Sequence, residues 1–181
     1  IERAIGDFSM AAKLEPNEAT AFSNRGNAYY DRGDHDRAIA DLNQAIKLDP
    51  KLVSAYYDRA IVYGAKGDAG RAIADFDQTL KIDGKNALAY YNRGLAMRTK
   101  GDDERALADF TQAMKLNPKY APAYYARGLA YRARGQAKQA MTDFEDAIKL
   151  DPQNAASYYE RGRAFFTGKD YDRAITDINQ A

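Results

Sequence analysis

The sequence predicts an all-α protein built from stacked helical repeats. Three observations predict this class: the residue pattern returns every 34 residues, each period holds two stretches of helical apolar spacing, and sustained strand-like alternation is absent. A period of this size indicates units that each bury an apolar face against their neighbours. One small residue marks the period in successive repeats: Gly26, Ala60, Gly94, Gly128 and Gly162.

The repeats are predicted to form one array over residues 1–181. We number the positions of each repeat from 1 to 34, with the marker glycine at position 8. The array then begins with the second helix of a partial repeat and ends in a truncated repeat, so we expect the chain to be a piece of a longer protein. The partial repeat is 1–18, the complete repeats are 19–52, 53–86, 87–120 and 121–154, and the truncated repeat is 155–181.

The first helix of each repeat is predicted from apolar or small residues at positions 4, 8 and 11, as in Tyr90, Gly94 and Met97. This spacing places one stripe on one face of a helix. We expect the aromatic residue at position 4 to point into the core. Positions 8 and 20 are small, which predicts a close crossing of the two helices of one hairpin.

A turn is predicted at positions 15 and 16, where glycine is followed by aspartate, as in Gly33 and Asp34. Glycine can adopt the left-handed conformation that ends a helix, and aspartate caps the helix that follows. Repeat four has Gln136 in place of the aspartate, and repeat five has Lys169 in place of the glycine. The second helix carries its apolar stripe at positions 20, 21, 24, 27 and 28, and it ends before a helix breaker. These breakers are Pro50, Gly84, Pro118 and Pro152.

This pattern resembles the tetratricopeptide repeat (TPR), and the resemblance covers the whole chain. Repeat four matches it fully, through Tyr124, Gly128, Tyr131, Ala140, Phe144, Ala147 and Pro152. The resemblance implies a right-handed α-solenoid whose first helices line a concave groove for peptides or partner helices. Two departures stand out: position 7 is arginine where leucine is common, and position 4 is phenylalanine or tyrosine where tryptophan is common.

The composition limits the classes of function. Lys and Arg (27) nearly balance Asp and Glu (26), so the chain has no strong field to attract nucleic acid or an anionic membrane. There is no cysteine, which removes disulfides and thiolate chemistry. No apolar run is long enough for membrane insertion. We therefore expect a soluble chain, and both cytoplasm and periplasm are compatible with it.

Catalytic constellations are not found in the sequence, and we predict a non-enzymatic protein without metal or cofactor. His35 is the single histidine and lies beside the turn of its repeat, without a second histidine or a cysteine to complete a metal site or a triad. The glycines follow the repeat period and form no phosphate-binding pattern.

A systematic polar pair joins the two helices of each repeat. Position 7 is arginine in every repeat that has a first helix, and position 23 is aspartate throughout, as in Arg93 and Asp109. We interpret these residues as an internal ladder of ion pairs, in which the arginine stem also covers apolar surface. A role in contacting a ligand is the alternative.

The predicted binding face consists of the first-helix positions that point away from the core stripe. Position 5 is tyrosine in four repeats, and either the ring packs between neighbouring first helices or it forms an aromatic shelf for a peptide. Positions 9 and 12 add aliphatic residues and arginines, and asparagine at position 6 appears twice. The predicted groove residues are Asn24, Asn27, Tyr57, Ile61, Tyr91, Asn92, Leu95, Arg98, Tyr125, Leu129, Arg132, Tyr159 and Arg163.

Two known subtypes of the family are not matched. The carboxylate clamp of chaperone-tail binders needs lysine at position 5, which is absent here, and the asparagine ladder at position 6 is limited to Asn24 and Asn92. Our first hypothesis is a protein-interaction scaffold that binds a protein or peptide. The alternatives are a self-assembling module, which could form a homodimer through its unfinished terminal repeats, and a regulatory arm of a larger enzyme or sensor. RNA binding is a weaker hypothesis because the groove is not strongly basic.

Overall fold

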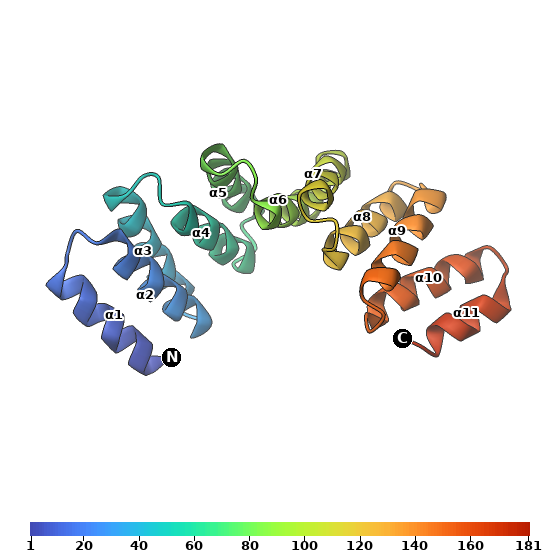
Figure 1. The fold of residues 1–181 in the computed structure, drawn as a ribbon, viewed down its shortest axis with the longest axis horizontal. Coiled ribbons are helices and arrows are strands. Elements are labelled where there is room, and N and C mark those ends of the chain that lie inside the picture. The colour runs from blue at the N-terminus through green and yellow to red at the C-terminus, as the bar shows by residue number, and fades with distance from the viewer. The chain divides into compact units, whose positions relative to one another are not determined.

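The computed structural model describes all 181 residues and contains helices and no strands, which confirms the all-α repeat fold. None of the helices combines the length and the apolar character that a membrane crossing requires. Figure 1 shows the helices in chain order, as α1 (Glu2–Leu14), α2 (Ala19–Asp31), α3 (His35–Leu48), α4 (Val53–Ala65), α5 (Ala69–Ile82), α6 (Ala87–Thr99), α7 (Asp103–Leu116), α8 (Ala121–Ala133), α9 (Ala137–Leu150), α10 (Ala155–Thr167) and α11 (Tyr171–Ile178).

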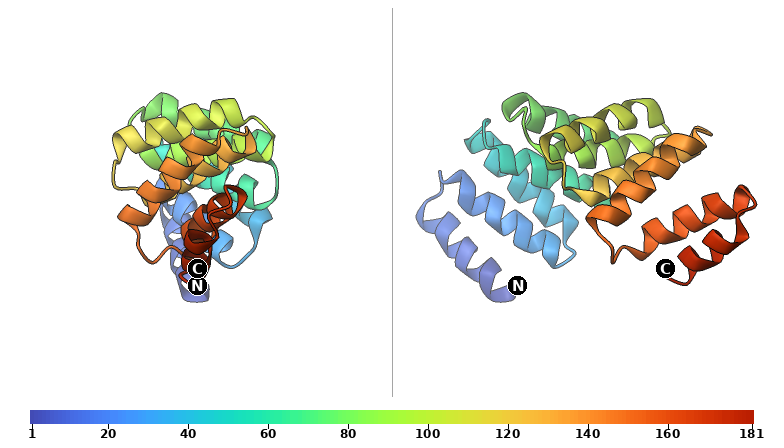
Figure 2. Two further views of the ribbon diagram at one scale, coloured as in Figure 1. Left: turned by 90° about the vertical axis from the view of Figure 1, so that its right-hand side faces the viewer. Right: turned by 45° about the vertical axis from the view of Figure 1, so that its right-hand side comes forward.

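The chain divides into two compact units, Ile1–Ala96 and Met97–Ala181. In the first unit, α2 pairs with α3 and α4 with α5 as hairpins, while α1 packs on α2 and α3 packs on α4. In the second unit, α8 pairs with α9 and α10 with α11, while α7 packs on α8 and α9 on α10 (Figure 2). Each unit is therefore a stack of helix-turn-helix repeats.

The turn between the two helices of a repeat has the predicted chemistry. Gly33 has a φ of 84°, in the left-handed region, and its N–H donates to Tyr30 O at 2.8 Å. The N–H of Asp34 donates to Tyr29 O at 2.9 Å, so two carbonyl groups at the end of α2 are satisfied. The carboxylate of Asp34 then caps α3 by accepting from the N–H of Arg37 at 3.2 Å.

The same carboxylate also accepts from the side chain of its arginine, which joins the cap to an ion pair. Asp68, Asp102 and Asp170 repeat this cap with Arg71, Arg105 and Arg173. The two predicted exceptions are present: Gln136 makes no side-chain cap, and Lys169 takes a φ of 63° where the other turns have glycine.

The two helices of a hairpin cross at the small residue of position 8. A Cβ atom placed on Gly128 would lie 2.6 Å from the ring of Phe144, whose side chain is 1% exposed. A Cβ atom on Gly26 would lie 2.9 Å from Leu42 Cγ. Repeat two carries Ala60 at this position opposite Phe76, so a single methyl group can be accommodated by a shift. A larger side chain would force the helices apart.

The expectation of a core ring at position 4 holds only in part, because these rings are half-buried, although Phe22 packs against the core cluster. The buried first-helix residue is the small one at position 3, such as Ala55 and Ala123, each 0% exposed. Tyr56 and Tyr124, which follow them, are only half-buried. Ala55 packs with Ala38, Leu42 and Ala45 on the second helix of the preceding repeat, where a small side chain fits, and the larger ring lies at the edge. There the guanidinium of the position-7 arginine stacks over it, as Arg59 does over Tyr56 at 5.8 Å.

We predict that Gly128→Leu destabilises the protein by roughly 1–3 kcal/mol, because the branched side chain overpacks the crossing with Phe144. Gly64→Ala is the matched control, since Gly64 is in an exposed part of α4 with no atom near the added methyl group. Alanine there should stabilise by up to about 1 kcal/mol through its higher helix propensity. Urea unfolding monitored by circular dichroism measures both changes. An unchanged midpoint for Gly128→Leu would refute the assigned register.

We predict that the aspartate caps make the fold sensitive to acid. Hydrogen bonds from the backbone and side chain of Arg105 lower the pKa of Asp102 below its ordinary value of 3.8. The unfolded chain therefore binds the proton first, so the stabilisation from the cap is present above about pH 4 and is lost as the pH falls below it. Asp102→Asn keeps a capping side chain but cannot titrate. Urea unfolding at pH 6 and pH 3 should show a smaller loss of stability on acidification for this variant than for the parent, and an equal loss would contradict the assignment.

Candidate functional site

The predicted ladder of ion pairs is present within each described hairpin. In repeat four, Arg127 donates from Nε to Asp143 Oδ2 at 2.8 Å and from Nη2 to Asp143 Oδ1 at 2.7 Å. This fork matches both oxygens of one carboxylate. The same two-bond arrangement joins Arg25 to Asp41, Arg59 to Asp75 and Arg161 to Asp177.

The same arginines also reach the preceding repeat, which the sequence analysis did not predict. Nη1 of Arg127 donates to Thr111 Oγ1 at 3.1 Å, and Nη1 of Arg25 donates to Ser9 Oγ at 3.3 Å. Their partners occupy position 25 of the preceding repeat. The side chains at this position are all polar: Ser9, Asn43, Asp77, Thr111 and Glu145. This shared polarity is the signal that could have predicted the contact.

The carboxylate of Asp143 in the ladder is buried enough for the loss of solvent to affect its pKa. Asp143 is 2% exposed, and its burial raises the pKa of the carboxyl group, while the hydrogen bond and charge of Arg127 act in the opposite direction. The hydrogen bond to Asp143 in turn raises the pKa of Arg127. The carboxylate is therefore tolerated in the core only because the arginine stays beside it.

The first-helix face is the surface formed by positions 5, 6, 9 and 12 of the first helices, where the predicted groove residues lie. In the first unit it is partly an internal network. The Tyr57 ring packs on Phe76 with centroids 5.7 Å apart, and its hydroxyl accepts from Asn92 Nδ2 at 2.8 Å. Asn27 Nδ2 donates to Asp58 Oδ2 at 2.7 Å. Of the other predicted residues here, Asn24 is exposed, and three are half-buried: Ile61, Tyr91 and Leu95.

In the second unit the first-helix face combines aromatic rings with arginines. Tyr125 packs on Phe144 with centroids 6.0 Å apart, whereas Tyr159 is 48% exposed beneath the guanidinium of Arg163. Arg132 and Arg163 both approach the carboxylate of Glu160. Leu129 is half-buried, and Nε of Arg98 lies 3.4 Å from Asp103 Oδ1.

The position-5 rings make a contact that differs from the expected packing between neighbouring first helices. Tyr57 and Tyr125 pack against the second helix of their own hairpin, and they keep an edge at the surface. Two acidic residues belong to the face and were missed as site residues: Asp58 and Glu160. Both occupy position 6, where they interrupt the asparagine pattern. Burial raises the pKa of Asp58, and the hydrogen bond from Asn27 partly opposes that shift.

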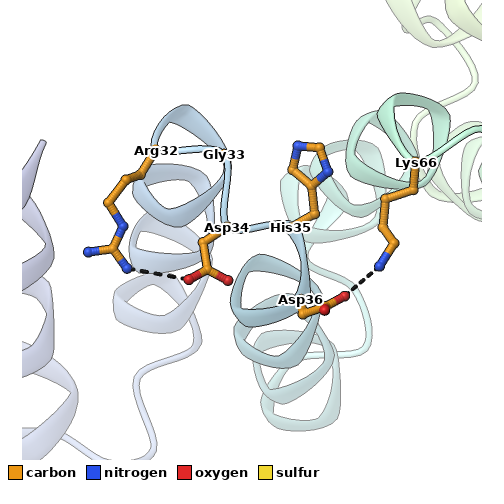
Figure 3. Close-up of a pocket in the computed structure, with 6 residues that line it drawn as sticks. All are labelled: Arg32, Gly33, Asp34, His35, Asp36 and Lys66. Carbon is orange, nitrogen blue, oxygen red and sulfur yellow. Dashed lines mark hydrogen bonds and ion pairs between the residues drawn. The ribbon is translucent and has the colours of Figure 1, made fainter.

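A polar depression beside the turn of repeat one surrounds His35, but its charges are already paired. Figure 3 shows Asp34 facing Arg32 and Asp36 facing Lys66, with the imidazole of His35 outside both pairs. The His35 ring stacks on Tyr30, with centroids 5.7 Å apart. A similar depression recurs at the turn of repeat three, which indicates a consequence of the repeat geometry. No three His, Asp or Glu side chains gather in an arrangement that could hold a metal ion.

Family models match most of the chain. The model described as "TPR repeat" matches residues 26–67, 97–131 and 128–168, and the model described as "Tetratricopeptide repeat" matches residues 53–86. The chain belongs to the tetratricopeptide repeat family. A comparison with curated protein sequences gives no match.

Solved TPR structures resemble this chain closely in fold. MamA is 28% identical with a TM-score of 0.81, and the match covers 86% of this chain and 91% of MamA. YrrB, described as a TPR protein with an unusual peptide-binding site, is 22% identical with a TM-score of 0.79, covering 96% of this chain and 89% of YrrB. PilF of Pseudomonas aeruginosa is 21% identical with a TM-score of 0.83, covering 90% and 74%.

Family membership gives the broad class of function. TPR proteins generally serve as scaffolds for protein–protein interaction, and they are typically non-catalytic. The ordered polar groups of this TPR chain fit that class, because most of them connect helices to one another.

We predict that Arg127→Leu destabilises the protein by about 3–5 kcal/mol, because it leaves the buried carboxylate of Asp143 without its cation. The double variant Arg127→Leu, Asp143→Leu removes both charges and should recover most of that loss. Urea unfolding of the parent, the single variant and the double variant measures the difference. Equal stability of the single variant and the parent would show that the ladder is irrelevant to the fold.

Proposed function

We propose that this TPR chain is a non-catalytic scaffold that holds a segment of a partner protein on its first-helix face. The observation that carries the proposal is that each first helix uses some positions to pack against other helices and keeps others at the surface. Position 8 forms the hairpin crossing, position 3 packs on the preceding repeat, and the arginine at position 7 joins the second helix and the preceding repeat. The remaining positions 5, 9 and 12 keep aromatic, aliphatic and arginine side chains partly exposed.

The composition of this face suits protein recognition. Tyrosine offers a large rigid contact area together with a hydroxyl group, and arginine provides planar donors for carboxylates. Both residue types are enriched at the centres of protein interfaces. YrrB, a TPR protein of similar fold, is described as having a peptide-binding site. A peptide or an extended segment is the partner that we propose for this chain as well.

A second candidate function is self-association through the outer helices. On α1, Met10 and Leu14 are 55% and 72% exposed, and Ile1, which precedes this helix, is 64% exposed. On α11, Tyr171 and Ile175 are 53% and 60% exposed. Exposed apolar side chains grouped on one helix commonly mark a contact surface. The occupant in this case would be a second copy of the chain, forming a homodimer.

We predict that a photo-crosslinker on the first-helix face captures a defined partner. Tyr159→p-benzoylphenylalanine places an aromatic crosslinker at an exposed position of this face, and Lys138→p-benzoylphenylalanine places it on the exposed side of α9 as a control. Irradiation in cells of the source organism should give one discrete product at residue 159 that is absent at residue 138, identified by mass spectrometry. The same products at both positions would contradict the proposal. Products that contain only a second copy of this chain would favour self-association.

A further inference from the structure

An apolar pocket opens between repeats four and five, within the second unit. Its volume is about 340 Å³, and its walls come from α8, α9 and α10. Ala140, Phe144 and Ala164 supply apolar wall, and Arg132, Glu160 and Arg163 are its charged residues. We call it the inter-repeat pocket.

Two residue differences distinguish this junction from the one between repeats one and two. Between repeats one and two, position 10 is Val62, which is 1% exposed and packs with Ala38 and Leu42. Tyr30 at position 12 packs against the same cluster. The equivalent residues at the inter-repeat pocket are Ala164 and Arg132, so a branched side chain and an aromatic ring are replaced by a methyl group and a cation. The space that Val62 and Tyr30 fill between repeats one and two is left open at the pocket.

The charges at the pocket do not cancel. Nη1 of Arg163 lies 3.6 Å from Glu160 Oε2, and Nη1 of Arg132 contacts the same oxygen. The Glu160 side chain is 9% exposed, whereas the side chains of Arg132 and Arg163 are 41% and 53% exposed. One buried carboxylate therefore faces two guanidinium groups, which leaves one positive charge in excess. Each guanidinium has five N–H donors, and most of them remain available at the rim.

We propose that the inter-repeat pocket anchors a partner segment in which a large apolar side chain stands next to an aspartate or glutamate. The apolar side chain enters between Phe144 and Ala164, and the neighbouring carboxylate receives N–H donors from Arg163 and Arg132. This inference rests on the proposed scaffold function and specifies the chemistry of the partner. A pocket of this size accommodates one large side chain and falls at the lower end of the range of ligand sites in proteins.

The charges at the pocket favour a segment that combines an apolar side chain with a carboxylate over a basic segment or an uncharged apolar segment. A basic segment would meet two exposed cations, and an uncharged apolar segment would leave the excess positive charge unpaired as water is expelled. A carboxylate beside the apolar group avoids repulsion between cations and pairs the excess positive charge. A fork of N–H donors on a carboxylate is also among the stronger polar contacts available at a protein surface.

The test is a titration of the ¹⁵N-labelled chain with short acetylated peptides, followed by NMR. The probe peptide is Gly-Gly-Leu-Glu-Gly-Gly, and the control peptides replace Glu by Gln or Leu by Ala. We expect the Leu-Glu peptide to shift the amide signals of Ala164 and Gly168 at the pocket and to saturate at millimolar concentration. Each control peptide should bind about tenfold more weakly, because it lacks either the charge-assisted hydrogen bonds or the buried side chain.

Three variants assign the binding to the pocket. Arg163→Gln removes the excess positive charge and leaves Arg132 on Glu160, so it should weaken the Leu-Glu peptide about tenfold without exposing an unpaired buried acid. Ala164→Leu fills the pocket and should abolish the shifts. Arg134→Gln removes one charge at the neighbouring turn, where Arg134 lies near Glu104, and should change nothing.

Specific outcomes would overturn the inference. It fails if the Leu-Glu peptide causes no shifts, if the Gln peptide binds equally well, or if Ala164→Leu still binds. A partner captured by the crosslinker at residue 159 together with no peptide binding at the pocket would leave the scaffold function intact and remove only this inference. Peptide binding at the pocket without a captured partner would support the chemistry assigned to the pocket and would count against the scaffold function.

Discussion

The ion pair that the position-7 arginine makes with the position-23 aspartate is the interaction on which the rest of the structure depends. In an array of repeats, each hairpin must hold its own helices together and also attach to the hairpin before it. Arg127 does both with one side chain, since two of its nitrogens bind Asp143 and a third reaches Thr111 of the preceding repeat. Apolar contacts between helices are non-directional. A buried fork of hydrogen bonds fixes the register, because a shift of either helix would leave Asp143 without its cation.

This use of the first helix determines which surface is left for a partner. The small residue at position 8 is buried in the hairpin crossing, the small residue at position 3 is buried against the preceding repeat, and the ring at position 4 lies beneath the arginine of position 7. The tyrosine at position 5 then packs one side of its ring on the second helix and keeps its edge at the surface, as Tyr125 does against Phe144. The first-helix face is therefore rigid where it is aromatic. A rigid surface loses less conformational entropy when it binds a segment.

Much of the fold follows from local chemistry that can be seen in the sequence. The turn at Gly33 and Asp34 is predictable because only glycine easily adopts that φ and because aspartate is a strong helix cap. The pairing of arginine at position 7 with aspartate at position 23 is also predictable from their recurrence. The edge location of Tyr56 is not, since it depends on how α4 packs on α3 of the preceding repeat. The inter-repeat pocket is lined by residues of α8, α9 and α10, among them Arg132 and Ala164, and only the packed structure brings these residues to one place.

The most direct measurement of the central claim is native-state hydrogen exchange across α7, α8 and α9 in low urea. If Arg127 ties repeat four to α7, the slowest amides of the three helices should open with one common free energy in the parent. In Arg127→Leu, Asp143→Leu, which lacks the contact to Thr111 but keeps an uncharged core, the amides of α7 should separate from those of α8 and α9. Separate opening already in the parent, or common opening retained in the double variant, would contradict the claim that this arginine couples neighbouring repeats.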